Sequence, residues 1–350
     1  MILIETLRKN AGKIGLSILV AVLLFAFVAQ FVNWSEFWTK LAQTRPLYLL
    51  AALGFFLVYQ ALRAWRMVAA VPSIQAQPRL VGTFCLQAAL NNFLPIGFGE
   101  LALSMLMRRI HAVDIVKAGT IVFALRALDV LVLCMMFLLS APWLLRVVPP
   151  ILFWIVAAIC VLGLAGGGLL LVSARRARQS NEDFLEQSDP TKNSGQTTDQ
   201  LNLVGKIRRR ARRIFTRSAV ALDQLSQEAK FWQLVGSTFA LWGIMWCVTF
   251  MVVRAIQLDL TVIEATAVYL VKFPVDLLPI KGFAGFGTHE TAWLAILHLI
   301  GKPDFAGYAA VASHIVMLFI ALLSALFGLV WLMVSGFSKK QKIAPVERDT

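Results

Sequence analysis

The residues best able to do chemistry are a few ionisable side chains that interrupt long apolar segments. On insertion scales a charged residue costs about 2.5–3.5 kcal/mol at the centre of a membrane helix, so it needs a partner or a polar cavity. These residues are Glu100, Arg126, Asp129, Lys272, Asp276, Lys281 and Glu290. Cations and acids occur in similar numbers among them, which favours a cavity that accepts an anionic group.

Two of the acids, Glu100 and Glu290, follow glycine-rich breaks at 91–100 and 278–290. Each acid is expected to start a helix, where a carboxylate stabilises the helix dipole and caps free amides. Alternatively, the same amides and carboxylates line a polar cavity, in which glycines let the backbone approach a ligand. The asparagines of the first break can bind a headgroup or cap the helix before it. The other candidate binding residues in the breaks are Asn91, Asn92, Gly97, Gly99, Gly285, Gly287 and His289.

The remaining ionisable residues stand at helical spacing. Arg126 and Asp129 are three residues apart, and Lys272 and Asp276 are four apart. Each pair can therefore neutralise itself on one helix face. Alternatively, Arg126 binds an anionic headgroup while Asp129 holds the guanidinium in place.

The elements that must position these residues are membrane helices. Hydrophobic residues make up 59% of the chain and charged residues 15%, with a mean hydropathy of +0.75. A soluble protein has about 25% charged residues, so this chain cannot cover a water-facing surface. Runs of about 20 apolar residues are long enough to cross a membrane. They predict spans at 14–32, 46–64, 118–141, 150–172, 231–253 and 308–334, the first of them retained rather than cleaved as a signal peptide.

The two broken segments, 80–109 and 262–300, predict re-entrant hairpins. Their arms of roughly 11 to 17 residues are short for a crossing, and both breaks contain Leu-Pro-Ile followed by Gly-Phe-Gly, which indicates an internal repeat. With both as hairpins and the N-terminus cytoplasmic, most of the 33 Lys and Arg residues fall on the cytoplasmic side. The predicted fold class is an all-α polytopic membrane protein with about six full spans and two re-entrant helical hairpins in inverted 4+4 repeats, as in many secondary transporters.

One polar stretch divides the membrane parts. We expect a first membrane repeat with the first span of the second at 1–172, a basic cytoplasmic linker at 173–230, the rest of the second repeat at 231–335, and a cytoplasmic tail at 336–350. Apolar residues at helical spacing in the linker predict a basic amphipathic helix on an anionic leaflet, or only a positive-inside anchor. Its basic residues include Arg208, Arg209, Arg210, Arg212, Arg213 and Arg217. They lack interleaved aromatic residues, which argues against nucleic acid as a partner.

Several kinds of chemistry are not indicated. His289-Glu290 is similar to the start of a zinc-protease motif, but Trp293 stands where the second histidine is needed. All four cysteines lie in apolar runs and are expected to be buried rather than disulfide-bonded. They are Cys85, Cys134, Cys160 and Cys247. We therefore predict no metal site, no cofactor and no enzyme activity.

Three motifs together resemble a known family. They are Asn92-Phe93-Leu94-Pro95 through Gly99-Glu100, Arg126-Ala127-Leu128-Asp129, and Leu278-Pro279 through Gly285, Gly287 and Glu290. Over about residues 10–335 the chain resembles the lysylphosphatidylglycerol synthase transmembrane (flippase-like) family, as a stand-alone member without the aminoacyl-transferase domain. Leu103 and Leu125 stand where this family usually has charged residues.

The resemblance implies a protein that translocates a polar or anionic lipid between leaflets, such as a phospholipid, an aminoacyl-lipid or a polyprenyl lipid or glycolipid. We expect a multi-pass protein of the bacterial cytoplasmic (inner) membrane with both termini cytoplasmic. Its partners are then membrane lipids with an anionic headgroup. The alternative is a non-transporting accessory subunit of a lipid or glycan biosynthesis enzyme, recruited through the linker.

Overall fold

The structure is a computed structural model that describes residues 19, 22–71, 78–93, 98–113, 115–165, 231–277 and 283–335. Within these ranges every regular element is helical, which confirms the predicted all-α class. The basic linker at 173–230 and the tail at 336–350 lie outside the described residues.

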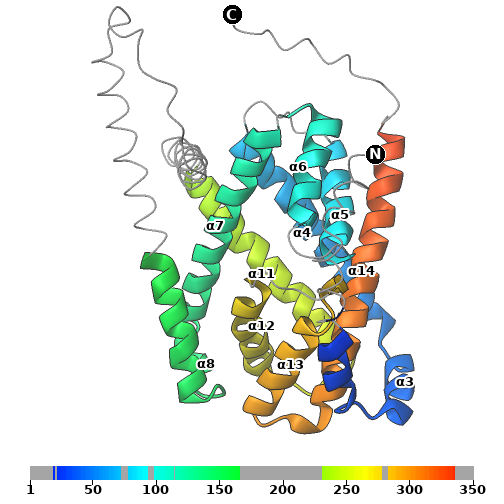
Figure 1. Cartoon of the computed structure of the whole chain (residues 1–350), viewed down its shortest axis with the longest axis vertical. Helices are drawn as coiled ribbons and strands as arrows, with labels where there is room; N and C mark the ends of the chain where they lie inside the picture. The colour runs from blue at the N-terminus through cyan, green and yellow to red at the C-terminus, as the bar shows by residue number, and fades with distance from the viewer. Residues whose placement is uncertain are drawn as a thin grey trace, which may run out of the picture.

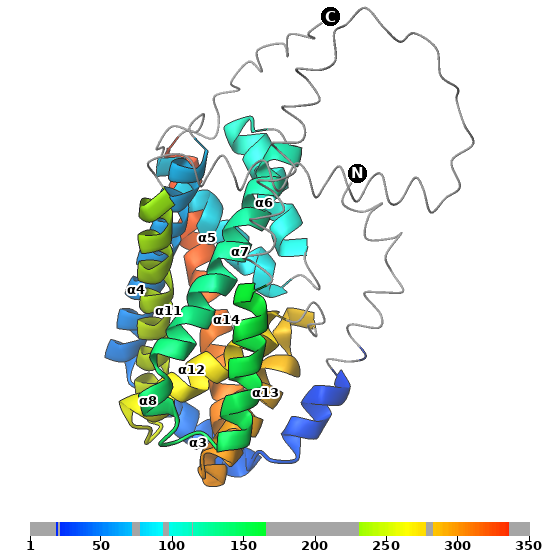
Figure 2. The same cartoon turned by 90° about the vertical axis from the view of Figure 1, so that its left-hand side faces the viewer.

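Four long helices run lengthwise through the molecule (Figures 1 and 2). They are α4 (Pro46–Ala70), α7 (Ile115–Leu139), α11 (Phe231–Ala255) and α14 (Ala306–Val334). With 25 to 29 residues each, they are about 38–44 Å long at 1.5 Å per residue. That length exceeds the hydrocarbon thickness of about 30 Å, and each helix contains a stretch apolar enough to cross a membrane.

The two other expected spans, 14–32 and 150–172, are only partly described. Residues 22–29 are helical, and a shorter apolar helix covers Pro150–Ala165. Short elements complete the described fold. They are α3 (Trp34–Ala42), α8 (Ala141–Leu144) and η2 (Pro303–Phe305).

Two pairs of short helices occupy opposite halves of the molecule. In both views α5 (Pro78–Phe93) and α6 (Phe98–His111) lie in the upper half, and α12 (Val262–Leu277) and α13 (Thr288–Leu299) in the lower half (Figures 1 and 2). The partners of each pair pack against each other. With 12 to 16 residues they are about 18–24 Å long, too short to cross. This geometry agrees with the predicted hairpins; their membrane sides and the inverted repeat stay predictions.

The second break packs against the first pair of short helices. The short helix η1 (Phe283–Gly285), within the second break, packs against α5 of the first pair. Helix α5 also packs along α14, where Gly82 and Gly328 allow a close crossing: a Cβ on Gly328 would lie 2.7 Å from the Gly82 carbonyl oxygen. Small residues commonly permit such close helix contacts in membranes. They hold the first pair against α14.

The outer surface is apolar where a soluble protein is polar. On α14 the side chains of Phe319, Leu322, Leu326 and Val330 recur every three to four residues and are 46–61% exposed. The helix Pro150–Ala165 has a similar exposed face with large apolar side chains. An apolar stripe facing outward at helical spacing is typical of contact with lipid chains.

Helix α12 begins with a capping box. The Thr261 backbone N–H donates to the Glu264 carboxylate at 2.7 Å, and the Glu264 N–H donates to the Thr261 hydroxyl at 3.2 Å. Lys302 Nζ lies 3.5 Å from the same carboxylate. Burial raises the pKa of Glu264, but the Thr261 hydrogen bonds and the Lys302 charge outweigh it, so this pKa is lowered overall. The carboxylate therefore stabilises the start of the second pair.

Candidate functional site

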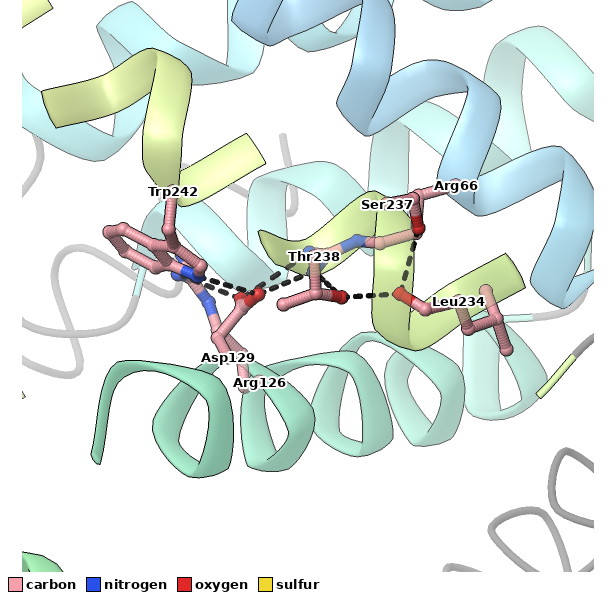
Figure 3. A network of polar contacts seen from close by, with 7 residues as sticks. All are labelled: Arg66, Arg126, Asp129, Leu234, Ser237, Thr238 and Trp242. Atoms are coloured by element: carbon pink, nitrogen blue, oxygen red, sulfur yellow. Dashed lines mark hydrogen bonds and ion pairs between the residues drawn. The ribbon is translucent and has the colours of Figure 1, made fainter. Parts of the chain in front are cut away.

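Asp129 is the centre of a buried polar cluster between α4, α7 and α11 (Figure 3). The Arg66 guanidinium donates to both Asp129 carboxylate oxygens, with Nη2 at 3.3 Å from Oδ2. The Trp242 indole N–H donates to Oδ1 at 3.2 Å, and Arg126 Nη1 lies 3.7 Å from Oδ2. We call Arg66, Arg126, Asp129, Thr238 and Trp242 the Asp129 cluster.

Three long helices position this cluster. Arg66 lies near the end of α4, which packs along α11, and there its Nη1 donates to the Thr238 hydroxyl at 3.1 Å. That hydroxyl in turn donates to the Leu234 carbonyl at 2.7 Å, one turn earlier in α11. The side chains of Arg66 and Asp129 are only 6% and 5% exposed. A buried charge pair of this kind fixes how α4, α7 and α11 lie relative to one another.

A third guanidinium lies beside the cluster. Arg63 donates to the Gln60 side-chain oxygen at 3.1 Å and to that of Gln87, on α5, at 2.9 Å. Its guanidinium carbon lies 4.8 Å from the centre of the Phe84 ring. Arg63 is also electrostatically coupled to the Asp129 cluster. Among the described side chains, three guanidinium groups thus gather near a single carboxylate.

Two buried donors in this region lack an acceptor within the described part of the chain. They are Arg66 Nε and Gln60 Nε2. Gln60, Arg63 and Arg66 are spaced three apart, so these donors share one face of α4. Buried polar groups are nearly always paired, because an unpaired one costs about 1–3 kcal/mol. A region rich in donors and poor in acceptors is suited to the oxygen atoms of an anionic group.

A second buried cluster lies at the break between α12 and α13. Glu290 is fully buried, and its Oε2 accepts the Gly287 backbone N–H at 2.7 Å while its Oε1 lies 2.5 Å from His314 Nδ1. His314 Nε2 contacts the Ala284 carbonyl oxygen at 3.0 Å. His314 belongs to α14, so these contacts connect the break to that helix. We call Ala284, Gly287, Glu290 and His314 the Glu290 cluster.

His289 lies against this cluster. Its ring stacks on the His314 ring with centroids 4.7 Å apart, and its Nε2 lies 3.2 Å from the Ser313 hydroxyl. The backbone of the break is left-handed at Ala284, Gly285 and Gly287. Glycine adopts this conformation readily, so Gly285 and Gly287 permit a tight turn here, while their predicted role in letting the backbone approach a ligand stays a prediction.

The structure thus gathers several predicted site residues into two clusters. Arg126 and Asp129 meet in one, as the sequence spacing suggests, and the other contains Gly287 and Glu290 with His289 and Gly285 beside them. Asn92 donates its amide to the Ala88 carbonyl at 2.9 Å, within α5. That contact lies within its own helix, as expected if Asn92 caps the end of α5 rather than binding a headgroup.

The structure describes the remaining predicted site residues only in part or not at all. Asn91 and Lys272 are partly buried, at the end of α5 and within α12. The backbones of Gly99, Glu100 and Asp276 are helical, but the side chains of Glu100 and Asp276 lie outside the description. Gly97, Lys281 and the linker arginines lie outside the described residues altogether.

Arg66, Thr238, Trp242 and His314 are cluster members that the sequence did not reveal. The predicted span ended at residue 64, which placed Arg66 in a cytoplasmic loop, whereas α4 continues to Ala70 with Arg66 buried. The three-residue spacing of Gln60, Arg63 and Arg66 on one face of an otherwise apolar helix was the available signal. The signal for His314 was a lone histidine within a strongly apolar helix.

Leu103 and Leu125, at positions where the resembled family usually has charges, are buried in one apolar cluster shared by α4, α5, α6 and α7. Cys85, Cys134 and Cys160 are buried as expected, and Cys247 is partly buried.

No curated protein matches the chain. A family model does match, described as the lysylphosphatidylglycerol synthase TM region, over residues 14–325. The match covers most of the 350 residues and includes both short-helix pairs and both clusters, as the motifs at 92–100, 126–129 and 278–290 indicate. The chain therefore belongs to the lysylphosphatidylglycerol synthase transmembrane-region family, and it is a multi-pass membrane protein.

Proposed function

We propose that this protein translocates a lipid with a polar, anionic headgroup between the two leaflets of the membrane. The main observation is the excess of donors around Asp129. Arg66 Nε and Gln60 Nε2 lack acceptors among the described residues, although both atoms are buried. Anionic oxygen atoms of a headgroup are the chemical complement of such donors.

The members of the Asp129 cluster have different roles in this proposal. Asp129 and Arg66 are almost fully buried and hold the three long helices together. Arg126 is 35% exposed, so its guanidinium is the one best placed to meet a headgroup that enters from outside. Asp129 orients Arg126 and prevents it from binding the anion too tightly to release it.

The short-helix pairs supply the path. Because η1 of the second break packs against α5 of the first pair, the two pairs of short helices meet, and discontinuous helices that meet commonly form a transport site. The headgroup crosses between the breaks while the acyl chains stay in the bilayer beside the apolar outer faces. Glu100, Lys272 and Lys281 belong to the breaks or their helices and are proposed to line the same path.

A proteoliposome assay tests this function. The full chain is reconstituted with trace fluorescent phosphatidylglycerol or phosphatidylcholine, and a membrane-impermeant quencher reports which leaflet each lipid occupies. We expect faster transfer of the anionic lipid, and a loss of about tenfold or more in Arg126→Gln, the usual effect of removing a charge-assisted hydrogen bond. Arg254→Gln is the matched control, because Arg254 contacts the Phe250 ring at the other end of α11.

Two outcomes contradict the proposal at different levels. Unchanged transfer in Arg126→Gln refutes the role of this guanidinium. Failure of the wild-type protein to move any tested lipid refutes translocation, and it favours the accessory subunit of a lipid or glycan synthase as the remaining function.

We also propose a bacterial cytoplasmic membrane with both termini on the cytoplasmic side. The two short-helix pairs then open to opposite sides. Cysteines introduced at the exposed positions Arg109, in the last turn of α6, and Asp304, after α13, are labelled with a membrane-impermeant maleimide in intact cells. We expect label at position 304 only; label at both positions, or at neither, contradicts the inverted arrangement.

A further inference from the structure

We propose that Glu290 and His314 form a buried proton-binding site, and that its proton holds the turn at 283–287 against α14. The ligand is a single proton, and the site shares no residue with the Asp129 cluster. The inference stands on the hydrogen-bond geometry of the His314 ring. Its coupling to lipid movement rests in addition on the proposed function.

The two ring contacts of His314 determine how many protons the pair holds. Nε2 lies 3.0 Å from the Ala284 carbonyl oxygen, and a carbonyl can only accept, so Nε2 carries a hydrogen. Nδ1 lies 2.5 Å from Glu290 Oε1, and a contact this short requires one proton between the two atoms. The pair is either imidazolium with carboxylate or imidazole with carboxylic acid. Both forms are neutral overall and contain the same exchangeable proton.

Losing this proton to water changes the pair from neutral to a charge of minus one. The products are a neutral imidazole, a carboxylate and a hydrated proton. The Nδ1 lone pair then faces a carboxylate oxygen at 2.5 Å, in a site where Glu290 is fully buried and His314 is 5% exposed. A buried charge without a partner is strongly unfavourable, so the contact must lengthen or the site must open to water.

The turn depends on this contact. Ala284 is left-handed with φ of 54°, which costs a non-glycine residue about 1–2 kcal/mol. Its carbonyl accepts from His314, and the Gly287 N–H donates to Glu290, so two hydrogen bonds of the turn pass through the pair, in addition to the one from the Thr288 hydroxyl to the Gly285 carbonyl. Loading with a proton therefore keeps the turn closed, and release of the proton frees it.

Two rings cover the site. The His289 and Phe286 rings pack against the His314 ring, with centroids 4.7 Å and 4.6 Å away respectively. The helices α4, α5 and α11 also pack against α14. Their titratable residues in the described ranges make no hydrogen bond or ion pair with His314. These residues are Tyr48, Tyr59, Arg63, Arg66, Arg79, Cys85, Cys247 and Arg254. Lys281 lies outside the described residues.

Hydrogen–deuterium exchange on the full chain in liposomes tests the proton site without any lipid transport. Exchange of the peptide covering 283–291 is expressed as protection relative to intrinsic rates. In the wild type we expect protection to fall about tenfold or more when the shared proton is lost at high pH, because the buried charge then frees the turn. Glu290→Gln keeps an uncharged hydrogen-bonding group and is expected to stay protected at every pH.

His298→Gln is the matched control, since the polar and ring contacts of His298 within the described ranges are with the Leu294 carbonyl of its own helix and with the Phe31 ring. It should reproduce the wild-type profile. Protection of wild-type 283–291 that does not depend on pH overturns the proton site, whether or not the variants fold. A pH dependence lost in His298→Gln overturns the assignment to His314.

A pH gradient across the proteoliposomes then tests the coupling. We expect the gradient to change wild-type lipid transfer at least severalfold, with no such change in Glu290→Gln. Transfer that ignores the gradient refutes coupling and leaves the proposed function intact. A pH-dependent turn in a protein that moves no lipid refutes the proposed function and leaves the proton site intact.

Discussion

Replacing Asp129 with asparagine tests the buried charge pair between Arg66 and Asp129. Asp129→Asn keeps the shape of the side chain but removes the charge that neutralises Arg66. Arg66 is 5% exposed, and among the described residues its guanidinium donates only to Asp129 and Thr238. Its guanidinium therefore stays buried with one neutral hydroxyl and an uncharged amide as partners.

The expected loss of stability follows from this burial. Breaking a buried ion pair by removing one partner costs about 3–5 kcal/mol, since the other charge remains without compensation. Replacing both partners by apolar residues, as in Arg66→Met with Asp129→Leu, is expected to be near neutral because neither charge is then buried. The double variant should thus be more stable than Asp129→Asn alone, although it changes more atoms.

Thermal unfolding in detergent, followed by a fluorogenic thiol reagent, measures this directly. The buried cysteines Cys85, Cys134 and Cys160 become reactive only when the helices separate. We expect the lowest Tm for Asp129→Asn and a Tm near that of the wild type for the double variant. The reverse order refutes the argument, because it means that the charge pair itself provides net stability. Transfer of anionic lipid should be lost in both variants, since Asp129 no longer orients Arg126 in either.

Three further outcomes follow from the packing and the capping contacts. Gly328→Ala should lower Tm, because its Cβ would lie 2.7 Å from the Gly82 carbonyl oxygen and such overpacking costs about 1–3 kcal/mol of stability. Gly243→Ala is the control, because there is open space around Gly243, and it should leave Tm unchanged. Gly287→Ala should destabilise the fold by more than the roughly 1–2 kcal/mol that an alanine in the left-handed conformation costs, because its Cβ would also clash with Leu24 of the N-terminal helix. A Tm equal to that of the wild type contradicts this. The pKa of Glu264 is lowered in the folded protein, so its carboxylate adds stability above the unfolded carboxyl pKa of about 4.3, and this stability is lost as pH falls through the folded pKa. Glu264→Gln lacks this contribution, so its Tm should fall less on acidification than the Tm of the wild type.

Much of the fold could be predicted because apolar runs and their interruptions are local signals. The long helices α4, α7, α11 and α14 coincide with predicted spans, and the breaks at 91–100 and 278–290 separate the short helices. The end of α4 was missed because Arg63 and Arg66 look like loop residues to a hydropathy argument. Only their partners, Gln87 on α5 and Asp129 on α7, make a polar helix end compatible with burial.

The site was predictable only where partners are close in sequence. Arg126 with Asp129, and Glu290 with its own helix start, follow from helical spacing and capping rules. The dominant contacts do not: Arg66 is 63 residues from Asp129, and His314 is 24 residues from Glu290. Which helix faces which is decided by packing of the whole bundle, so no local pattern identifies these pairs.

Helix α5 connects the two clusters and explains how one could influence the other. Its Gln87 side chain holds Arg63, on the same face of α4 as Arg66, while α5 also packs against η1 in the second break. Its close crossing at Gly82 and Gly328 fixes it to α14, the helix that contains His314. A turn at 283–287 released from His314 therefore changes its contact with a helix that also positions a guanidinium of the anion site. Since α5 touches both, coupling between proton and headgroup needs no movement of the long helices α4, α7 and α11.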